Sequence, residues 1–261
     1  MAGSWLYPLG AVFGLLVSAW AWERAVAPDF RPSTRQRHAI FLGCLVGAAI
    51  GAKLGYAFAE GVSLLRNDRL TWMLRAQALL QGKTVTGALL GAYFGVEVAK
   101  RRVRYAYPTG DRFALLAPLS LAIARLGCWT RGCCLGVPIA EAAWSLRDAR
   151  GIARWPAVPL EFAFNLAFLA WAAWQLRRRE RIVASGASLH GQLFHVYLMA
   201  YGGFRFAHEF LRDTPRWVGP FSGYHVLSLA LLALGTAAFI QRAAQRLPRT
   251  ATTSPDKHCA L

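Results

Sequence analysis

The stretch that decides the fold is RLGCWTRGCCLG, residues 125–136. It places a cation, Arg125, and three cysteines at the end of an apolar run over 115–123. Such a run is typical of a membrane helix, and hydrocarbon does not solvate a guanidinium group. Arg125 must therefore face protein, water or an anionic ligand.

The whole chain is apolar. Its 261 residues are 56% hydrophobic, which is too apolar for a typical soluble domain and long enough for several membrane spans. We predict an all-α polytopic membrane protein with seven transmembrane helices in a single domain over 1–249, followed by a disordered cytoplasmic tail over 250–261. The seven apolar segments cover 5–23, 39–60, 84–99, 113–129, 157–176, 190–210 and 221–241. No basic region precedes the first segment, so we expect a retained helix rather than a signal peptide.

Basic residues indicate the orientation. The linkers on one predicted side carry 17 Lys and Arg, whereas those on the other side carry 10. The richer side should be cytoplasmic, which puts the N-terminus outside and the C-terminus inside. The outer linkers over 61–83 and 130–156 each hold a tryptophan among charges, and we expect short amphipathic segments in the membrane interface there.

The net charge of +17 does not indicate nucleic acid binding. The basic residues lie in short clusters between apolar runs, without an RNA- or DNA-binding motif around them. Topology signals and contacts with anionic lipid explain them better, so we expect a membrane and no nucleic acid as partner.

Three cations, Lys53, Arg125 and Arg205, lie within or at the edge of apolar runs. Snorkelling to the membrane surface is the ordinary explanation for each. Three such residues in one bundle instead favour a shared anionic site, and the planar fork of arginine suits phosphate oxygens. Tyr201, Arg205 and Glu209 are spaced i, i+4, i+8 and form one helical stripe. Glu209 either neutralises Arg205 or orients it towards a ligand.

The cysteine cluster has several interpretations. Cys128, Cys133 and Cys134 can be small residues filling a tight turn, a redox pair, or nucleophiles biased towards thiolate by nearby arginines. The total of five cysteines excludes a complete disulfide framework. Zinc would need a fourth ligand at tetrahedral spacing, so we expect no metal and no cofactor.

The sequence resembles the prolipoprotein diacylglyceryl transferase family over nearly the whole chain. The matching features are the Arg-x-Gly segment that ends in Gly136, the Tyr201/Gly202/Arg205/Phe206/Glu209 pattern, Gly51-Ala52-Lys53 with Tyr56, and Pro156 with Glu161. The resemblance implies a seven-helix enzyme of the bacterial inner membrane. It would move diacylglyceryl from phosphatidylglycerol to the cysteine thiol of a lipoprotein precursor, or of another acceptor, and release glycerol phosphate.

The resemblance also implies a set of site residues. It assigns Arg125 and Arg205 to the lipid phosphate and Glu209 to orienting Arg205, and we add Cys128 and Cys133 as candidate catalytic thiols. The residues expected to bind substrate are Tyr7, Lys53, Tyr56, Thr86, Gly87, Gly136, Glu161 and Tyr201.

The chain departs from the family pattern at several of these positions. Thr86 replaces a histidine, Ala88 a glycine, Cys128 an asparagine, Cys133 an acidic residue and Lys53 an arginine. This is the pattern of a divergent, cysteine-bearing branch. Threonine is no base near neutral pH, so the acceptor thiol would need Glu209, or Cys128 or Cys133 would attack first. Two rival functions are a membrane thiol oxidoreductase that uses the three cysteines and a non-catalytic protein that binds phosphatidylglycerol.

Overall fold

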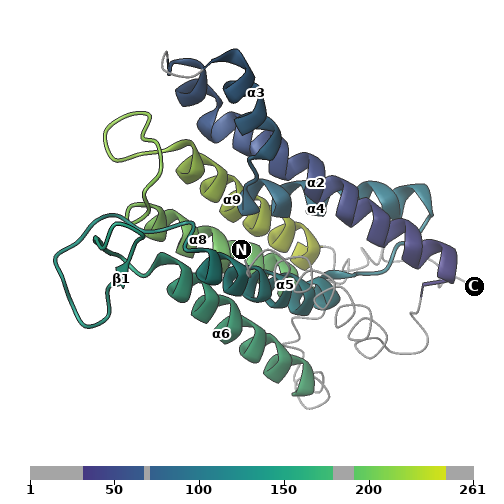
Figure 1. The fold of residues 1–261 in the computed structure, drawn as a ribbon. Helices are drawn as coiled ribbons and strands as arrows, with labels where there is room; N and C mark the ends of the chain where they lie inside the picture. Colours follow the sequence, from purple (N-terminus) through teal and green to yellow (C-terminus); the bar gives the residue numbers. More distant parts are fainter. Residues whose placement is uncertain (1–31, 68–70, 179–190, 245–261) are drawn as a thin grey trace, which may run out of the picture.

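A computed structural model describes residues 32–67, 71–178 and 191–244. This part of the chain contains seven helices and one short hairpin (Figure 1). The helices are α2 (Thr34–Leu65), α3 (Trp72–Gln81), α4 (Val85–Arg102), α5 (Gly110–Arg131), α6 (Ala157–Arg177), α8 (Leu193–Glu209) and α9 (Gly223–Ala244). The apolar segment predicted over 5–23, with Tyr7, and the tail over 250–261 lie outside the described residues.

Helical membrane-protein architecture agrees with the prediction. Four of the described helices, α2, α5, α6 and α9, are long and apolar enough to cross a membrane. Large apolar side chains on the outer face of α2, such as Leu42 and Leu54, are more than 60% exposed. An exposed apolar face of this kind suits contact with lipid. The prediction of seven spans goes beyond these four candidates.

The two outer linkers differ in structure. The segment over 61–83 contains a helix, α3, which begins at Trp72 and is held at its N-terminus by the Thr71 hydroxyl. The segment over 130–156 contains an antiparallel hairpin of β1 (Leu146–Arg147) and β2 (Ala153–Arg154) instead of an amphipathic helix. Positive φ angles at Gly132, Cys134 and Gly151 turn the chain repeatedly in this linker, and a helix cannot continue through them.

Helices α2 and α4 pack with their backbones in contact. Glycines from both helices line this seam: Gly43, Gly47, Gly51, Gly55, Gly87, Gly91 and Gly95. A Cβ added to Gly91 would overlap the carbonyl oxygen of Gly47, and one added to Gly51 would overlap that of Gly87. Close packing through small residues is the usual way in which membrane helices associate. The seam therefore makes α2 and α4 one unit, with α3 at one end (Figure 1).

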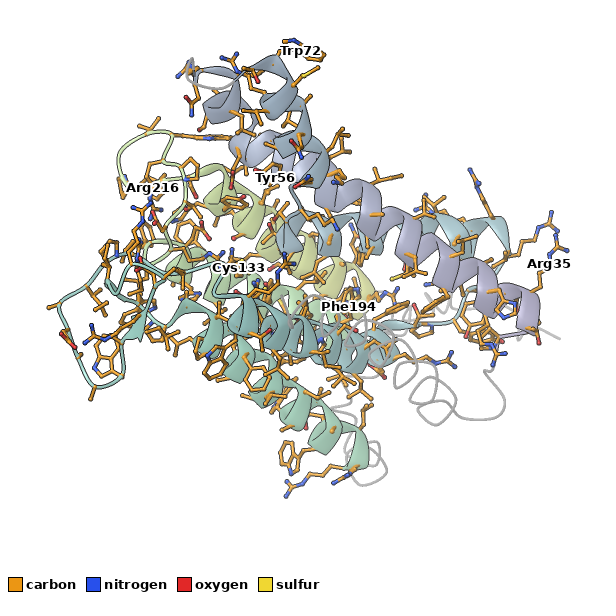
Figure 2. All side chains as sticks on the ribbon, in the orientation of Figure 1. Arg35, Tyr56, Trp72, Cys133, Phe194 and Arg216 are labelled. Atoms are coloured by element: carbon orange, nitrogen blue, oxygen red, sulfur yellow. The ribbon has the colours of Figure 1, made fainter. Side chains whose placement is uncertain are left out.

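Helix α8 is the centre of the other group of helices. It packs against α9 and α5, and α6 packs against α5. Tyr197, Leu198 and Tyr201 of α8 and Leu231 of α9 are fully buried. Figure 2 shows Arg35 and Trp72 at opposite ends of the arm formed by α2 and α3, with Cys133 and Arg216 in the rest of the bundle. The end of α5, the start of α6 and the end of α8 meet in this second group and form the site.

Candidate active site

The Glu161 carboxylate is the centre of a buried charge cluster. Glu161 lies in the second turn of α6 and is fully buried. Its Oε1 accepts hydrogen bonds from Arg125 Nη2 and Tyr201 Oη, each at 2.6 Å. Its Oε2 accepts from Arg205 Nη1 at 3.2 Å and Arg212 Nη1 at 3.4 Å. One carboxylate therefore gathers three guanidinium groups from two other parts of the chain.

Glu209 is the second buried carboxylate. Its Oε2 accepts from Arg205 Nη2 at 2.9 Å, which is the i, i+4 pair expected from the helical stripe. Its Oε1 accepts from the Thr214 hydroxyl at 2.7 Å. Arg205 is thus held between Glu209 and Glu161, and every carboxylate oxygen of the cluster has a donor.

Positive charge exceeds negative charge in this cluster. Arg125, Arg205 and Arg212 form ion pairs with only two carboxylates, those of Glu161 and Glu209. Within the described residues, the buried Nε atoms of Arg205 and Arg212 have no hydrogen-bond partner. Buried charge is tolerated only when it is compensated. An anion that accepts from these arginines would supply the missing charge.

The 125–136 segment reaches the cluster through backbone pairing. Helix α5 ends at Arg131 and is capped by Gly132, whose φ of 61° is left-handed, and the chain then turns towards the end of α8. Gly136 forms an antiparallel bridge with Arg212, and Val137 N donates to Leu211 O at 3.0 Å. A Cβ on Gly136 would lie 2.5 Å from the carbonyl oxygen of Trp155. Gly136 therefore allows a close backbone approach that brings its segment beside Arg212.

The three predicted thiols lie together at the end of α5. The sulfur atoms of Cys128, Cys133 and Cys134 are all within 4.8 Å of one another. Arg125 Nη1 donates to Cys128 Sγ at 3.7 Å, so the thiols adjoin the charge cluster. A hydrogen bond from Cys128 lowers the pKa of Cys134; partial burial opposes this, and the charges of Arg212 and Arg125 reinforce it. Burial and the neighbouring Cys134 raise the pKa of Cys133.

Comparison with known proteins identifies the family. A family model described as prolipoprotein diacylglyceryl transferase matches residues 4–241. The chain belongs to this family. Two similar proteins, both called phosphatidylglycerol–prolipoprotein diacylglyceryl transferase, come from Vibrio vulnificus (strain YJ016) and Geobacter sulfurreducens. The Vibrio protein is 26% identical over 239 residues, which cover 88% of this chain and 84% of the relative. The Geobacter protein is 28% identical over 205 residues, or 75% of this chain and 74% of the relative.

The predicted prolipoprotein diacylglyceryl transferase site is divided in the structure. Arg125, Arg205, Glu209, Glu161 and Tyr201 come together, with Cys128, Cys133 and Gly136 beside them. The remaining described candidates, Lys53, Tyr56, Thr86 and Gly87, belong to the unit of α2, α3 and α4.

Each of these four residues makes contacts within that unit. Lys53 Nζ donates to the carbonyl oxygen of Leu80 on α3, and the expectation that Lys53 shares an anionic site with Arg125 and Arg205 stays a prediction. Thr86 is buried, and its hydroxyl lies 2.7 Å from that of Thr84. Gly87 lies in the glycine seam, and the ring of Tyr56 covers Gly82.

Sequence reasoning missed two arginines of the site. Arg212 and Arg216 look like linker charges, yet they follow Glu209 by three and seven residues, which are helical spacings that extend the stripe beyond the end of α8. Arg216 donates to the carbonyl oxygens of Glu209, Phe210 and Arg212 at 3.1, 3.2 and 2.9 Å. A cation there complements the negative end of the helix dipole. The continued stripe was the available signal.

Proposed function

We propose that the protein is a transferase of the bacterial inner membrane that moves diacylglyceryl from phosphatidylglycerol to an acceptor thiol. Membership of the family and the names of the relatives support this activity. The acceptor we propose is the cysteine of a lipoprotein precursor. We keep the predicted single domain of seven spans over 1–249, with the N-terminus outside and the C-terminal tail in the cytoplasm.

The observation that carries this proposal is the excess of positive charge around Glu161, where the partly buried Arg212 and Arg216 join the buried Arg125 and Arg205. Arg125, Arg205 and Arg212 face two carboxylates, and Arg216 adds a fourth cation at the same helix end. A positive excess therefore persists even when Cys134 is a thiolate. Phosphatidylglycerol carries one phosphate diester, whose single negative charge matches such an excess.

The same charge would promote the reaction. A bond forms between the acceptor sulfur and the glyceryl carbon, and the bond from that carbon to the phosphate oxygen breaks. The electron pair leaves with glycerol phosphate, which gains negative charge, and the acceptor thiol loses its proton. Arg125 and Arg205 are fixed in place before the substrate arrives, so they can stabilise this charge without reorganisation.

The thiol proton needs an acceptor within the chain. All four carboxylate oxygens of Glu161 and Glu209 already accept hydrogen bonds. His208 is 5% exposed, stacks on Phe204 with ring centroids 5.0 Å apart, and has two ring nitrogens without a hydrogen-bond partner among the described residues. We therefore propose His208, rather than Glu209, as the base that replaces the family histidine missing at Thr86.

Transfer does not need a covalent intermediate on the predicted thiols Cys128 and Cys133. If either attacked first, the diacylglyceryl group would be stored as a thioether. A thiolate leaves carbon less readily than a phosphate does, so the second step would be slow. We therefore favour direct displacement by the acceptor thiol, with Cys128 held beside Arg125.

The test is transfer by the purified full-length protein in detergent with labelled phosphatidylglycerol and a lipobox peptide. We expect release of glycerol phosphate, and we expect Arg205→Ala to reduce it by at least about 100-fold. Arg178→Ala is the matched control, since Arg178 lies over the ring of Trp174 at the other end of α6. Normal turnover by a folded Arg205→Ala variant would show that the headgroup assignment is wrong.

One observation favours a second function, the binding of phosphatidylglycerol without catalysis. Thr86 occupies the position of the family histidine, and its hydroxyl pairs with Thr84 in a buried contact. In this case the purified protein retains the lipid, Arg205→Ala weakens retention, and no glycerol phosphate appears with any thiol acceptor.

A further inference from the structure

We propose that Cys128, Cys133 and Cys134 form a binding site for one thiophilic metal ion, held by three thiolates, and that monovalent copper is the ion it fits. This proposal does not rest on the proposed function. It rests on three sulfur atoms that lie within 4.8 Å of one another, beside the arginine cluster around Glu161.

The spacing of the sulfur atoms suits a single ion. Three points no more than 4.8 Å apart lie within about 2.8 Å of a common centre, and metal–thiolate bonds are about 2.3 Å long. Each sulfur therefore needs to move by about 0.5 Å, which a small side-chain rotation provides. Cys133 and Cys134 are exposed and Cys128 is partly so, which leaves an ion a route to the site.

The backbone folds two sequence-adjacent cysteines back onto the third. Gly132 and Cys134 both have a φ of 61°, and between them Cys133 N donates to Cys128 O at 3.2 Å. The Cys133 thiol also points at this carbonyl, with Sγ 3.6 Å from the oxygen. A left-handed conformation is unusual for a cysteine. Here it directs Cys134 to the same side as Cys128.

The number of ligands selects the kind of ion. Within the described residues, no histidine or carboxylate completes the group of three sulfurs. Our expectation of no metal was argued from zinc, which takes four ligands in structural sites. Monovalent copper prefers soft sulfur ligands and is satisfied by three of them. The proposal therefore departs from that expectation for an ion of low coordination number.

The surrounding charge also suits a copper trithiolate. Three thiolates that bind one Cu⁺ form a complex with charge −2. Arg125 Nη1 lies 3.7 Å from Cys128 Sγ, Arg212 acts on Cys134 through its charge, and Arg131 acts on Cys133. These arginines compensate the complex, which would otherwise be costly beside a low-dielectric bundle.

The experiment titrates the full-length protein with Cu(I) in detergent, without oxygen, after reduction by a phosphine. A chromophoric Cu(I) chelator competes for the ion and reports the affinity. We use Cys259→Ser as the background, because Cys259 lies outside the described residues. We expect one Cu(I) per chain, and we expect Cys128→Ser, Cys133→Ser and Cys134→Ser each to weaken binding by at least about tenfold.

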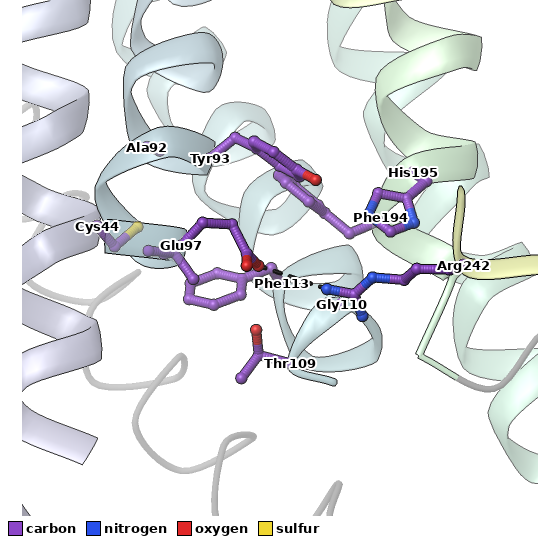
Figure 3. Close-up of a pocket in the computed structure, with 11 residues that line it drawn as sticks. Cys44, Ala92, Tyr93, Glu97, Thr109, Gly110, Phe113, Phe194, His195 and Arg242 are labelled. Carbon is purple, nitrogen blue, oxygen red and sulfur yellow. Dashed lines mark hydrogen bonds and ion pairs between the residues drawn. The ribbon is translucent and has the colours of Figure 1, made fainter. Parts of the chain in front are cut away.

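Cys44→Ser is the matched control. Cys44 lines a separate cavity of about 20 Å³, where Glu97 pairs with Arg242 (Figure 3). We expect this variant to bind copper as the background protein does. The proposal would be overturned if the Cys133→Ser and Cys134→Ser variants bound copper as tightly as the background protein, or if the Cys44→Ser variant alone bound it more weakly.

A second measurement needs no variant. X-ray absorption of the copper-loaded protein should show three sulfur neighbours at about 2.3 Å. Two sulfurs, or a shell of nitrogen and oxygen, would show that the trio is not the site. Failure of the fully reduced protein to bind one equivalent of copper would also overturn it. None of these results depends on lipid transfer, so the two proposals can fail separately.

Discussion

Arg125 Nη2 donates to Glu161 Oε1 over 2.6 Å and so joins the last turns of α5 to the start of α6. Both side chains are almost inaccessible, with relative exposures of 7% and 0%. The same carboxylate holds Arg205 of α8. Three helices therefore meet at a single carboxylate. The stability of their packing should depend on it, and variants can test this.

Glu161→Gln should destabilise the protein strongly. The change leaves three arginines with Glu209 as their only carboxylate in the cluster, and breaking a buried ion pair costs about 3–5 kcal/mol. Denaturation in detergent, followed by circular dichroism, measures the loss. Glu141→Gln is the control, because the Glu141–Arg147 pair is exposed and should contribute less than about 1 kcal/mol. Similar losses in both variants would contradict the central role of Glu161.

Gly91→Ala should separate α2 from α4. The new methyl group would overlap the carbonyl oxygen of Gly47, and neither backbone can move without disturbing the rest of the seam. Overpacking of this kind costs about 1–3 kcal/mol. The matched control is Gly203→Ala in α8, where an added Cβ meets nothing within 4 Å and should stabilise the helix by up to about 1 kcal/mol. Thermal unfolding should give a lower melting temperature for Gly91→Ala and a higher one for Gly203→Ala.

His208→Gln should lower transfer while leaving the fold intact. Loss of a general base reduces turnover by about 10²–10⁴-fold. The acidic limb of the pH–rate profile should disappear with it, which a merely structural role would not cause. His38→Gln, at the exposed start of α2, is the control and should turn over normally. An unchanged pH profile in the His208 variant would exclude it as the base.

Acid should loosen the hairpin of β1 and β2. Burial raises the pKa of Asp148, but hydrogen bonds from Ile152 N, Arg150 N and Arg154 outweigh it and hold this pKa below the usual 3.8. The stabilisation is therefore complete above pH 3.8 and is lost as the pH falls through the lower, folded-state value. The ring centroids of Trp144 and Trp155 lie 5.2 Å apart, and the fluorescence of these two tryptophans reports the change.

The Asp148→Asn variant is the test of that assignment. It lacks the ionised carboxylate, so its tryptophan signal should stay constant through the same acid range. A transition at the same pH in the variant would assign the effect to another group.

Local patterns predicted much of the helical framework. Apolar runs located each described helix from α4 to α9, although α2 begins at Thr34, earlier than the run that starts at 39. The i, i+4 spacing predicted the pair of Arg205 with Glu209. Such features depend on residues that are close in sequence, where helical geometry alone fixes the neighbours.

The centre of the site depends on long-range packing and could not be predicted in the same way. Glu161 receives donors that lie 36, 40, 44 and 51 residues away, and no local period relates Glu161 to those positions. The contact of Lys53 is long-range as well: its Nζ donates to the carbonyl oxygen of Leu80, which lies in α3, 27 residues away.

The glycine seam has a mechanical consequence. Since the α2 and α4 backbones touch at Gly47 and Gly91, neither helix can slide or roll against the other without a steric clash. The two helices should therefore move as one rigid body. If a phospholipid enters as proposed, it has to pass beside this pair of helices rather than between α2 and α4.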